Sequence, residues 1–336
     1  MAKTGIIGSG SWGCALACVL ERNGHQVSVW SIDEREISML KEMHEYKDKL
    51  PGVKLPEGIT FTCDLEEASA GMDLIVLAVP SVYTRSTARK MAPFIRQNQI
   101  VVSVAKGIEE ESLMILTDII EEEIPAADAA VLCGPSHAEE VGIGLPTTLV
   151  AGAKSKKTAE YIQSVFMNEV FRVYTSPDMI GMELGGALKN VIALAAGMAD
   201  GLGFGDNTKA ALITRGIAEI SRLAVKMGAN AETINGLTGI GDLIVTCASK
   251  HSRNRKAGML MGQGYTMQQA MDEVHMVVEG VYSAKAALAL AEKNQVSMPI
   301  IEQVNQVLFA DKSAKEAVAD LMLRDKKPEH SNLTWE

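Results

Sequence analysis

The fold class is decided by the stretch Lys3-Thr-Gly-Ile-Ile-Gly8-Ser-Gly10-Ser-Trp-Gly13, near the start of the chain. An apolar run from Cys14 to Leu20 follows it, Asn23-Gly24 provides a helix stop, and Gln26–Trp30 alternates apolar and polar residues. The spacing predicts a strand over 3–7, a helix after the glycine turn and a second strand over 26–30. A strand, a G-x-G-x-x-G turn, a helix and a strand within about 30 residues are the full context of the dinucleotide-binding fingerprint.

The three glycines of this turn have separate mechanical roles. We expect Gly8 to make the tight turn, Gly10 to let backbone amides approach a pyrophosphate, and Gly13 to let the helix pack closely on the strand. The N-terminus of the helix adds partial positive charge at the same place. The sequence therefore predicts a dinucleotide site; the alternative is that the glycines serve the turn alone.

The identity of the dinucleotide stays open. The acidic residue that contacts the adenosine ribose is expected about 20 residues after the turn, at the end of the second strand. Asp33 near that position would favour NAD, whereas Ser31 together with Arg35 would admit the 2′-phosphate of NADP. Asp33 could equally be the N-cap of the next helix. The cofactor is accordingly expected to be NAD or NADP.

Further α/β units follow the first pair of strands. We expect strands at 74–79, 100–104, 131–132, 148–152 and 171–175, and helices at 82–95, 112–123 and 156–167. Near-continuous apolar strands between helices are typical of a mostly parallel, doubly wound sheet. The pattern predicts a Rossmann-like α/β dinucleotide-binding domain over residues 1–176.

Ligands of such a sheet bind at the carboxyl ends of its strands. Three turns are expected there, namely Val79-Pro80-Ser81, Ala105-Lys106-Gly107 and Cys133-Gly134-Pro135-Ser136-His137-Ala138. Lys106 suits an anionic substrate, although a surface lysine in a turn would look the same in the sequence. His137 is a candidate general base, or equally a structural residue at a helix start.

The β/α alternation stops after Ser176-Pro177, and helical periodicity continues to about Leu323. This change predicts an all-α substrate-binding domain over 177–323, followed by a polar tail over 324–336.

One helix of this second domain contains an unusual lysine. The stretch from Met182 to Met198 is apolar nearly all round, which is typical of a buried helix, yet Lys189 and Asn190 lie in its middle. A lysine there either extends to solvent or holds its amine in a dry site, where its pKa falls and it can act as a base.

A basic loop lies further along the same domain. The run Lys250-His-Ser-Arg-Asn-Arg-Lys256 gathers cations in an acidic protein, and Arg253 beside Asn254 could bind a phosphate. A solvated charged turn is the alternative. Nucleic acid is the least favoured partner, because no aromatic residue interleaves these cations and the net charge of −10 opposes binding to polyanions.

The remaining composition argues for an ordinary globular protein of the cytoplasm. Its 336 residues include five cysteines, with neither a CxxC pair nor zinc spacing, and we expect them to be reduced core residues. No metal site is expected. The residues after Lys3 lack a signal-peptide cleavage pattern, and we expect no stretch long and apolar enough to span a bilayer.

Several sequence blocks in one order resemble the soluble NAD(P)-dependent glycerol-3-phosphate dehydrogenases of the bacterial type. The resemblance covers Lys3 to about Val307. It is carried by Gly8-x-Gly10-Ser11-Trp12-Gly13, Lys106-Gly107, Gly134-Pro135-Ser136-x-Ala138, Glu183-Leu184-x-Gly186-Ala187-Leu188-Lys189-Asn190, Thr214-Arg215-Gly216, Gly239-x-Gly241-Asp242-Leu243, Ser252-Arg253-Asn254 and Val278-Glu279-Gly280.

The resemblance implies interconversion of sn-glycerol 3-phosphate and dihydroxyacetone phosphate by hydride transfer, supplying glycerol 3-phosphate for phospholipid synthesis. It implies that Lys189 is the catalytic proton acceptor and donor, assisted by Lys106. The substrate contacts that it implies are Lys106, Gly134, Ser136, Lys189, Asn190, Asp242, Ser252, Arg253 and Asn254. Besides the glycines of the turn and the open candidate Asp33, the implied cofactor contacts are Ser11, Trp12, Lys106, Ala138, Arg253, Val277 and Glu279. A homodimer through apolar helices of the second domain is also implied.

Two positions depart from the family pattern, and two other functions stay open. Ser31-Ile32 stands where many members have Gly then His near the adenosine ribose, and Cys133 stands where a serine is common. Another two-domain dehydrogenase of β-hydroxyacids would also place a lysine on a helix after the nucleotide domain. A non-catalytic NAD(P)H-sensing regulator is the alternative from a different class.

Overall fold

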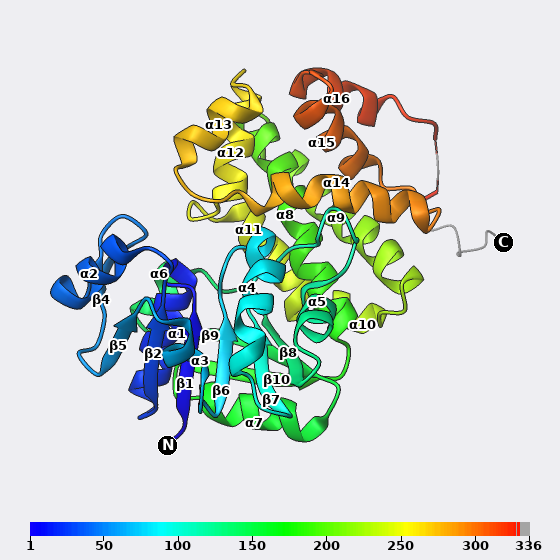
Figure 1. Ribbon diagram of the computed structural model, residues 1–336. Coiled ribbons are helices and arrows are strands. Elements are labelled where there is room, and N and C mark those ends of the chain that lie inside the picture. The colour runs from blue at the N-terminus through cyan, green and yellow to red at the C-terminus, as the bar shows by residue number, and fades with distance from the viewer. Residues whose placement is uncertain (327, 330–336) are drawn as a thin grey trace.

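An eight-stranded sheet organises the first half of the chain (Figure 1), in the order β5-β2-β1-β6-β7-β8-β9-β10. The computed structural model describes residues 1–326, 328 and 329. The strands are β1 (Lys3–Ile7), β2 (Gln26–Trp30), β5 (Ile59–Thr62), β6 (Leu74–Leu77), β7 (Gln99–Ser103), β8 (Ala127–Cys133), β9 (Thr147–Ala153) and β10 (Phe171–Ser176). All neighbouring strands pair in parallel except β8 and β9, which are antiparallel. The expected Rossmann-like sheet is confirmed.

Helices cover both faces of this sheet. They are α1 (Ser11–Arg22), α2 (Glu34–Met43), α3 (Leu65–Ser69), α4 (Thr84–Met91), α5 (Leu116–Glu123), α6 (Ala138–Gly142) and α7 (Lys156–Phe166), and a hairpin of β3 (Glu45–Tyr46) and β4 (Leu50–Lys54) follows α2. Because side chains alternate along a strand, Ile6 packs with α1 and α7 on one face, whereas Ile7 packs with α3, α4 and α5 on the other. The strands are therefore apolar on both faces.

Some expected bounds differ from the structure. The segment expected as a helix over 82–95 is α4 with a 3₁₀ turn at each end. The helix expected from Ser112 begins at Leu116, because the preceding residues turn back on themselves and Ile108 bridges to Ile115. The elements α3, β3, β4 and β5 had no counterpart among the expectations, whereas α2 is the helix for which Asp33 was a candidate N-cap.

Among the described residues after Ser176, the regular elements are all helices, joined by turns and loops. Its helices are α8 (Met179–Gly201), α9 (Asp206–Lys226), α10 (Ala231–Ile234), α11 (Asp242–Ala248), α12 (Arg253–Gly262), α13 (Met267–Val274), α14 (Glu279–Lys293), α15 (Pro299–Phe309) and α16 (Ala314–Met322). We keep 1–176 and 177–323 as proposed domain bounds, because β10 ends at Ser176 and α8 begins at Met179. In the proposed tail over 324–336, positions 327 and 330–336 lie outside the described residues.

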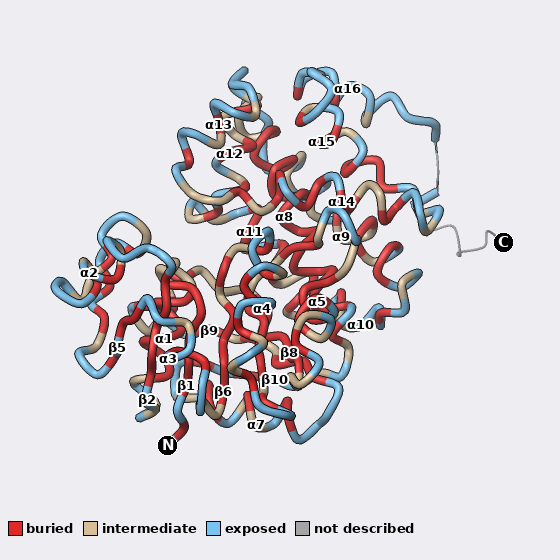
Figure 2. The backbone as a smooth tube through the Cα atoms, in the orientation of Figure 1, coloured by how far each residue is buried: buried red, intermediate tan, exposed pale blue. Residues whose placement is uncertain are grey.

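Helix α8 runs through the centre of the helical region, and Figure 2 shows its buried backbone among exposed outer helices. The expectation that no stretch is long and apolar enough to span a bilayer is wrong by length and composition. Met179–Gly201 has 23 residues with a mean hydropathy of 1.3 over its most apolar window. That window is 89% buried within the protein, because the surrounding helices cover it.

Helices α8 and α12 meet almost backbone to backbone. A Cβ atom added at Gly258 of α12 would lie 2.1 Å from the carbonyl oxygen of Leu194 on α8, and one added at Gly197 of α8 would lie 2.1 Å from that of Arg255. Only glycine permits so close an approach. This contact brings the start of α12, with its basic residues, against the middle of α8.

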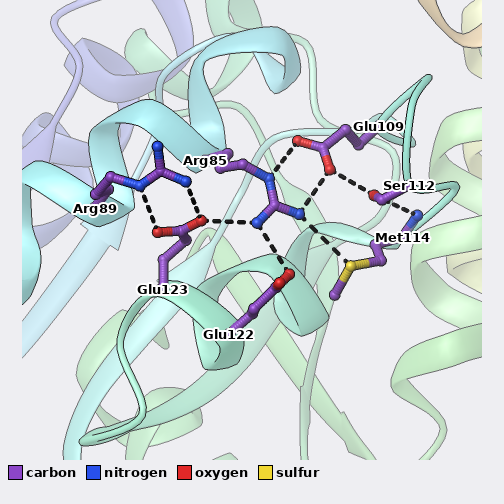
Figure 3. A network of polar contacts seen from close by, with 7 residues as sticks. All are labelled: Arg85, Arg89, Glu109, Ser112, Met114, Glu122 and Glu123. Atoms are coloured by element: carbon purple, nitrogen blue, oxygen red, sulfur yellow. Dashed lines mark hydrogen bonds and ion pairs between the residues drawn. The ribbon is translucent and has the colours of Figure 1, made fainter.

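An ion-pair network ties the loop after β7 to two helices of the sheet (Figure 3). Arg85 of α4 donates to both carboxylate oxygens of Glu109 at 2.8 and 2.7 Å, and to Glu123 of α5 at 2.7 Å. Arg89 adds two further hydrogen bonds to Glu123. The network holds the segment that follows Lys106, because Glu109 belongs to the same loop.

The cysteine expectation is correct in one respect and wrong in another. All five cysteines are free thiols, and Cys14, Cys18, Cys133 and Cys247 are buried. Cys63 is exposed and is not a core residue.

Candidate active site

A cavity of about 1330 Å³ lies where the carboxyl ends of the parallel strands face the helical region. Its walls come from the β1–α1 turn, the ends of β2, β6 and β7, and residues of α8, α11, α12 and α14. Ligand sites of doubly wound sheets lie at this edge. The cavity gathers most of the residues singled out in the sequence.

The glycine turn forms one wall of this cavity. Gly8 has a φ of +122°, and a Cβ atom there would lie 2.7 Å from the carbonyl carbon of Ala78, so any other residue would clash. Gly13 does not line the cavity; a Cβ atom there would lie 2.0 Å from the carbonyl oxygen of Gly8, which confines its role to packing. Gly10, the N-cap of α1, faces open space, and Ser11 and Trp12 also line the cavity. The turn therefore leaves room for a pyrophosphate at the N-terminus of α1 and fits a dinucleotide.

Of the three residues considered for contact with the ribose, Asp33 and Arg35 lie away from the cavity and Ser31 lines it. The Asp33 carboxylate accepts hydrogen bonds from the backbone amides of Arg35 and Glu36, at 2.9 and 3.3 Å, and so caps α2. Asp33 and Arg35 are exposed and absent from the cavity wall, whereas Ser31, Ile32 and Glu36 line it.

Two lysines and one aspartate meet at the deepest part of the site. Lys189 of α8 is 5% exposed and donates to Oδ1 of Asp242, the first residue of α11, and to the Thr246 hydroxyl at 2.6 Å. Lys106 donates to Oδ2 of the same Asp242 at 2.7 Å and to the Gly134 carbonyl at 3.0 Å. The Asp242 carboxylate thus bridges the two lysine amines, and Thr246 orients the amine of Lys189.

Local backbone geometry places Asp242. It follows a single π-helical turn, Leu237–Gly241, and a Cβ atom at Gly239 of this turn would lie 1.9 Å from the carbonyl oxygen of Ile234. π-Helical turns often occur at functional sites. The glycines seen in the sequence therefore compact the turn that delivers Asp242 to α8.

The charges of this cluster shift one another's pKa values. Burial lowers the pKa of Lys189 to about 8; Asp242 opposes this shift and Lys106 adds to it. Burial alone would lower the pKa of Lys106, but its proximity to Asp242 outweighs this and raises it. Burial would raise the pKa of Asp242, but the two lysines hold it below its usual value. Of the two amines, Lys189 is the one that can be neutral near physiological pH.

The basic loop forms another part of the cavity wall. Ser252 caps α12, its hydroxyl accepting from the Arg255 amide at 3.2 Å. The Arg253 side chain is exposed, lines the cavity and donates to the Val277 carbonyl at 3.2 Å.

Two of the predicted substrate residues bond to each other. Asn254 donates to the Asn190 side chain at 3.0 Å and accepts from the Gly280 amide at 2.8 Å, so it joins α12, α8 and α14. Both asparagines still line the cavity.

The third strand-end turn contributes part of the wall. Ser136, His137 and Ala138 line the cavity, whereas Gly134 does not; its carbonyl accepts hydrogen bonds from Lys106 at 3.0 Å and from the Ser136 hydroxyl at 2.9 Å. Burial lowers the pKa of His137 to about 4, so its imidazole is neutral. Its ring lies 5.8 Å from that of His251, centroid to centroid, and both rings border the cavity.

The residues Val277 and Glu279 complete the wall between the two halves. Glu279, the first residue of α14, accepts a hydrogen bond from the Ser81 amide at 3.0 Å and another from the Ser81 hydroxyl. This contact joins the turn after β6 to the helical region.

Sequence reasoning missed several residues of the wall. Thr246 could have been found, because it follows Asp242 by four residues and so shares its helix face. Glu36 lies in the first turn of α2, three residues after the open candidate Asp33, and was not considered. His251 lies in the basic run 250–256, although it was not named as a site residue. Lys49 carries no local signal that would single it out, and only the fold brings it to the cavity.

The sheet, the glycine turn and the buried lysine together define the class of two-domain dinucleotide-dependent dehydrogenases. Within that class, the chain belongs to the NAD-dependent glycerol-3-phosphate dehydrogenase family. The family's N-terminal part matches residues 3–159, and its C-terminal part matches residues 178–319. The resemblance seen in the sequence is thereby confirmed.

Similar proteins match this chain over nearly its full length. The chain is 73% identical over 335 residues to glycerol-3-phosphate dehydrogenase [NAD(P)+] of Agathobacter rectalis, covering 100% of both chains. It is 60% identical to the protein of that name from Fusobacterium nucleatum, covering 98% of this chain and 99% of that one. A crystal structure of glycerol-3-phosphate dehydrogenase from Coxiella burnetii superimposes with a TM-score of 0.93 at 35% identity, covering 96% of this chain and 99% of that chain. D-Mandelate dehydrogenase shares the fold alone, with a TM-score of 0.64 at 16% identity.

Proposed function

We propose that this protein interconverts sn-glycerol 3-phosphate and dihydroxyacetone phosphate, using NAD(H) or NADP(H). The observation that carries the proposal is the buried Lys189 amine, hydrogen-bonded to Asp242 and Thr246 on a cavity that also contains the glycine turn. The family membership and the names of the relatives support this choice of substrate.

In the proposed mechanism, Lys189 moves the proton of the substrate hydroxyl. The bound nicotinamide would supply or accept the hydride. When the alcohol is oxidised, the neutral amine of Lys189 takes the hydroxyl proton; in the reverse direction, its ammonium group protonates the developing alkoxide. A lysine pKa of about 8 lets both forms be present near neutral pH.

Lys106 and Asp242 would set the electrostatics of this step. Lys106 stays charged and can stabilise negative charge on the substrate oxygen. Its charge also disfavours the ammonium form of Lys189. Asp242 bridges the amines, which fixes their positions and limits the fall of the Lys189 pKa.

The basic loop would bind the phosphate of the substrate. Arg253 lines the cavity, and the hydrogen bond between Asn254 and Asn190 holds α12 against α8. Binding energy gained at the phosphate, away from the reacting carbon, can then align that carbon with Lys189. This anchoring favours a phosphate ester over a simple β-hydroxyacid.

We further propose that the protein works in the cytoplasm as a homodimer and supplies glycerol 3-phosphate for phospholipid synthesis. The five free thiols agree with a reducing compartment. Exposed apolar side chains of the helical region, including Phe204, Val225 and Phe309, are available for a second copy. Sedimentation equilibrium of the purified protein tests the dimer, and a monomer at micromolar concentration would contradict it.

One experiment tests the central proposal. Dihydroxyacetone phosphate is added to the protein with NADH and, separately, with NADPH, and the loss of reduced nicotinamide is followed by absorbance. Turnover with at least one cofactor is expected, with sn-glycerol 3-phosphate as product. Absence of turnover with both, although both bind, would contradict the dehydrogenase and favour a nucleotide-sensing protein.

A further inference from the structure

A carboxylate that no sequence motif indicated lies at the end of β2, the strand that meets the adenosine ribose in dinucleotide-binding folds. Glu36, in the first turn of α2, has a side chain only 10% exposed and lines the cavity. Its Oε2 accepts from the Ser31 hydroxyl at 2.5 Å, and its Oε1 accepts from the Lys49 ammonium group at 2.8 Å. Ser31 and Lys49 line the same wall.

This small cluster is held in place from three sides. Asp33 caps α2 and fixes the turn that carries Glu36. The Ser11 hydroxyl donates to the Lys49 carbonyl at 2.5 Å, which ties the segment before β4 to the start of α1. The Lys49 ammonium group also lies over the Tyr46 ring, 4.8 Å from its centroid. The carboxylate is thus preorganised at a defined position on the wall.

The charge of Glu36 determines whether this wall accepts a ribose with a free 2′-hydroxyl or one with a 2′-phosphate. Burial would raise the pKa of Glu36, but hydrogen bonds from Lys49, Ser31 and Tyr46 lower it below its usual value, so the group is charged at neutral pH. A carboxylate offers about four acceptor positions, and these three contacts leave one that can accept from a ribose hydroxyl. A 2′-phosphate would instead bring negative charge beside Glu36.

The cations nearby do not offset this repulsion. Lys49 is already paired with Glu36, and Arg35, which could have received a 2′-phosphate, is exposed and outside the cavity wall. Lys90 also lines the cavity, but it belongs to α4, the helix that follows β6. Because β1 lies between β6 and β2 in the sheet, α4 follows a strand that is not a neighbour of β2.

We infer that Glu36, positioned by Ser31 and Lys49, reads the adenosine ribose and makes the protein select NAD(H) over NADP(H). The inference rests on the proposed function in that it takes the dinucleotide to lie in this cavity. It assigns a specificity residue to a site whose cofactor preference the sequence left open.

The test measures cofactor binding without substrate. Dissociation constants for NADH and NADPH are determined by nicotinamide fluorescence for the wild type, Glu36→Gln and the control Glu34→Gln. Glu34 is exposed, lies outside the cavity wall and carries the same charge. The wild type is expected to bind NADH at least about tenfold more tightly than NADPH, and Glu36→Gln to reduce that ratio by about tenfold. Glu34→Gln should leave the ratio unchanged.

Several outcomes would overturn the inference. One is equal binding of NADH and NADPH by the wild type; another is an unchanged ratio in a folded Glu36→Gln variant. Glu36→Asp keeps the charge and provides a second variant, which should retain a preference for NADH. Selective loss of NADPH binding in Lys49→Met would show instead that Lys49 receives a 2′-phosphate. Because substrate is absent, failure to reduce dihydroxyacetone phosphate would contradict the proposed function without changing these ratios.

Discussion

Lys189 in the middle of α8 donates a hydrogen bond to Asp242 at the start of α11, although 53 residues separate them in the sequence. The same carboxylate holds Lys106, 136 residues away from it, at 2.7 Å. A buried charge that loses its partner is strongly destabilising. The cluster therefore makes the protonation of Lys189 depend on both neighbours.

Replacing Lys189 by Ala should lower kcat by about 10²- to 10⁴-fold, because it removes the proposed proton donor and acceptor. Initial rates with dihydroxyacetone phosphate measure the loss, and nicotinamide fluorescence should show that cofactor still binds. Lys226→Ala, at an exposed position of α9, is the matched control. Near-normal turnover by Lys189→Ala would disprove the assignment.

The rates in the two directions should depend on pH in opposite senses. Glycerol 3-phosphate oxidation needs the neutral amine, so its kcat should rise as pH increases through about 8, the pKa of Lys189. Reduction of dihydroxyacetone phosphate needs the ammonium group and should fall over the same range. Because Asp242 raises the Lys189 pKa, Asp242→Asn should move both midpoints to lower pH. Midpoints that stay in place in a folded Asp242→Asn variant would exclude this coupling.

Arg253→Ala should raise the KM for dihydroxyacetone phosphate by about 10- to 100-fold, the range expected for losing a hydrogen bond to a charged group. The effect on unphosphorylated dihydroxyacetone should be small, since that compound has no phosphate to bind. Steady-state kinetics with both compounds separate the two cases. Lys256→Ala provides the control, because Lys256 is an exposed cation of the same helix outside the cavity wall. An equal effect on both substrates would argue against phosphate binding by Arg253.

Gly258→Ala should destabilise the protein by about 1–3 kcal/mol, the usual range for overpacking a core. The new methyl group would lie 2.1 Å from the Leu194 carbonyl oxygen, so α12 must move away from α8. Chemical denaturation measures the free energy of unfolding. Gly205→Ala is the control, since a Cβ atom there meets no atom within 4 Å. Equal stability of the two variants would show that the helices can separate without cost.

Glu183 should make the stability of the protein fall as pH rises. Burial raises the pKa of Glu183 from 4.5 to about 7, despite hydrogen bonds from the Thr117 amide and hydroxyl. A carboxyl with a raised pKa in the folded state stabilises most at low pH, and this contribution is lost as pH rises through about 7. Glu183→Gln should remove up to about 3 kcal/mol of that dependence. Unfolding free energies from pH 5 to pH 8, measured for both proteins, should converge or cross toward higher pH as the wild type loses stability. Parallel curves would contradict the raised pKa.

The sequence was most informative where the signal was local. Strand β1, the glycine turn, α1 and β2 occur at their expected positions, because the turn and the two apolar periods lie within one continuous segment. The lysine on an apolar helix was visible for the same reason, since a helix that is apolar nearly all round is expected to be buried. The expected start of α5 was wrong, because a bridge between Ile108 and Ile115 outweighs helical periodicity there.

The ribose site shows where local signals are not sufficient. The sequence left Ser31, Asp33 and Arg35 open, with helix capping as the alternative role of Asp33. The Asp33 carboxylate does cap α2, and Glu36, which the sequence did not single out, lines the cavity. One residue of rotation about a helix is 100°, so neighbours in sequence face different surroundings.

What the sequence by itself determined is the Rossmann-like half, the helical half and the chemical character of a lysine in an apolar helix. Only the tertiary structure decided that Asp242 bridges Lys189 and Lys106, that α12 meets α8 through glycines, and that Glu36 lies on the cofactor wall. The physical reason is the distance along the chain over which each kind of interaction acts. Periodicity and turn preferences act over a few residues, whereas a shared carboxylate or a backbone contact between helices depends on how distant segments pack.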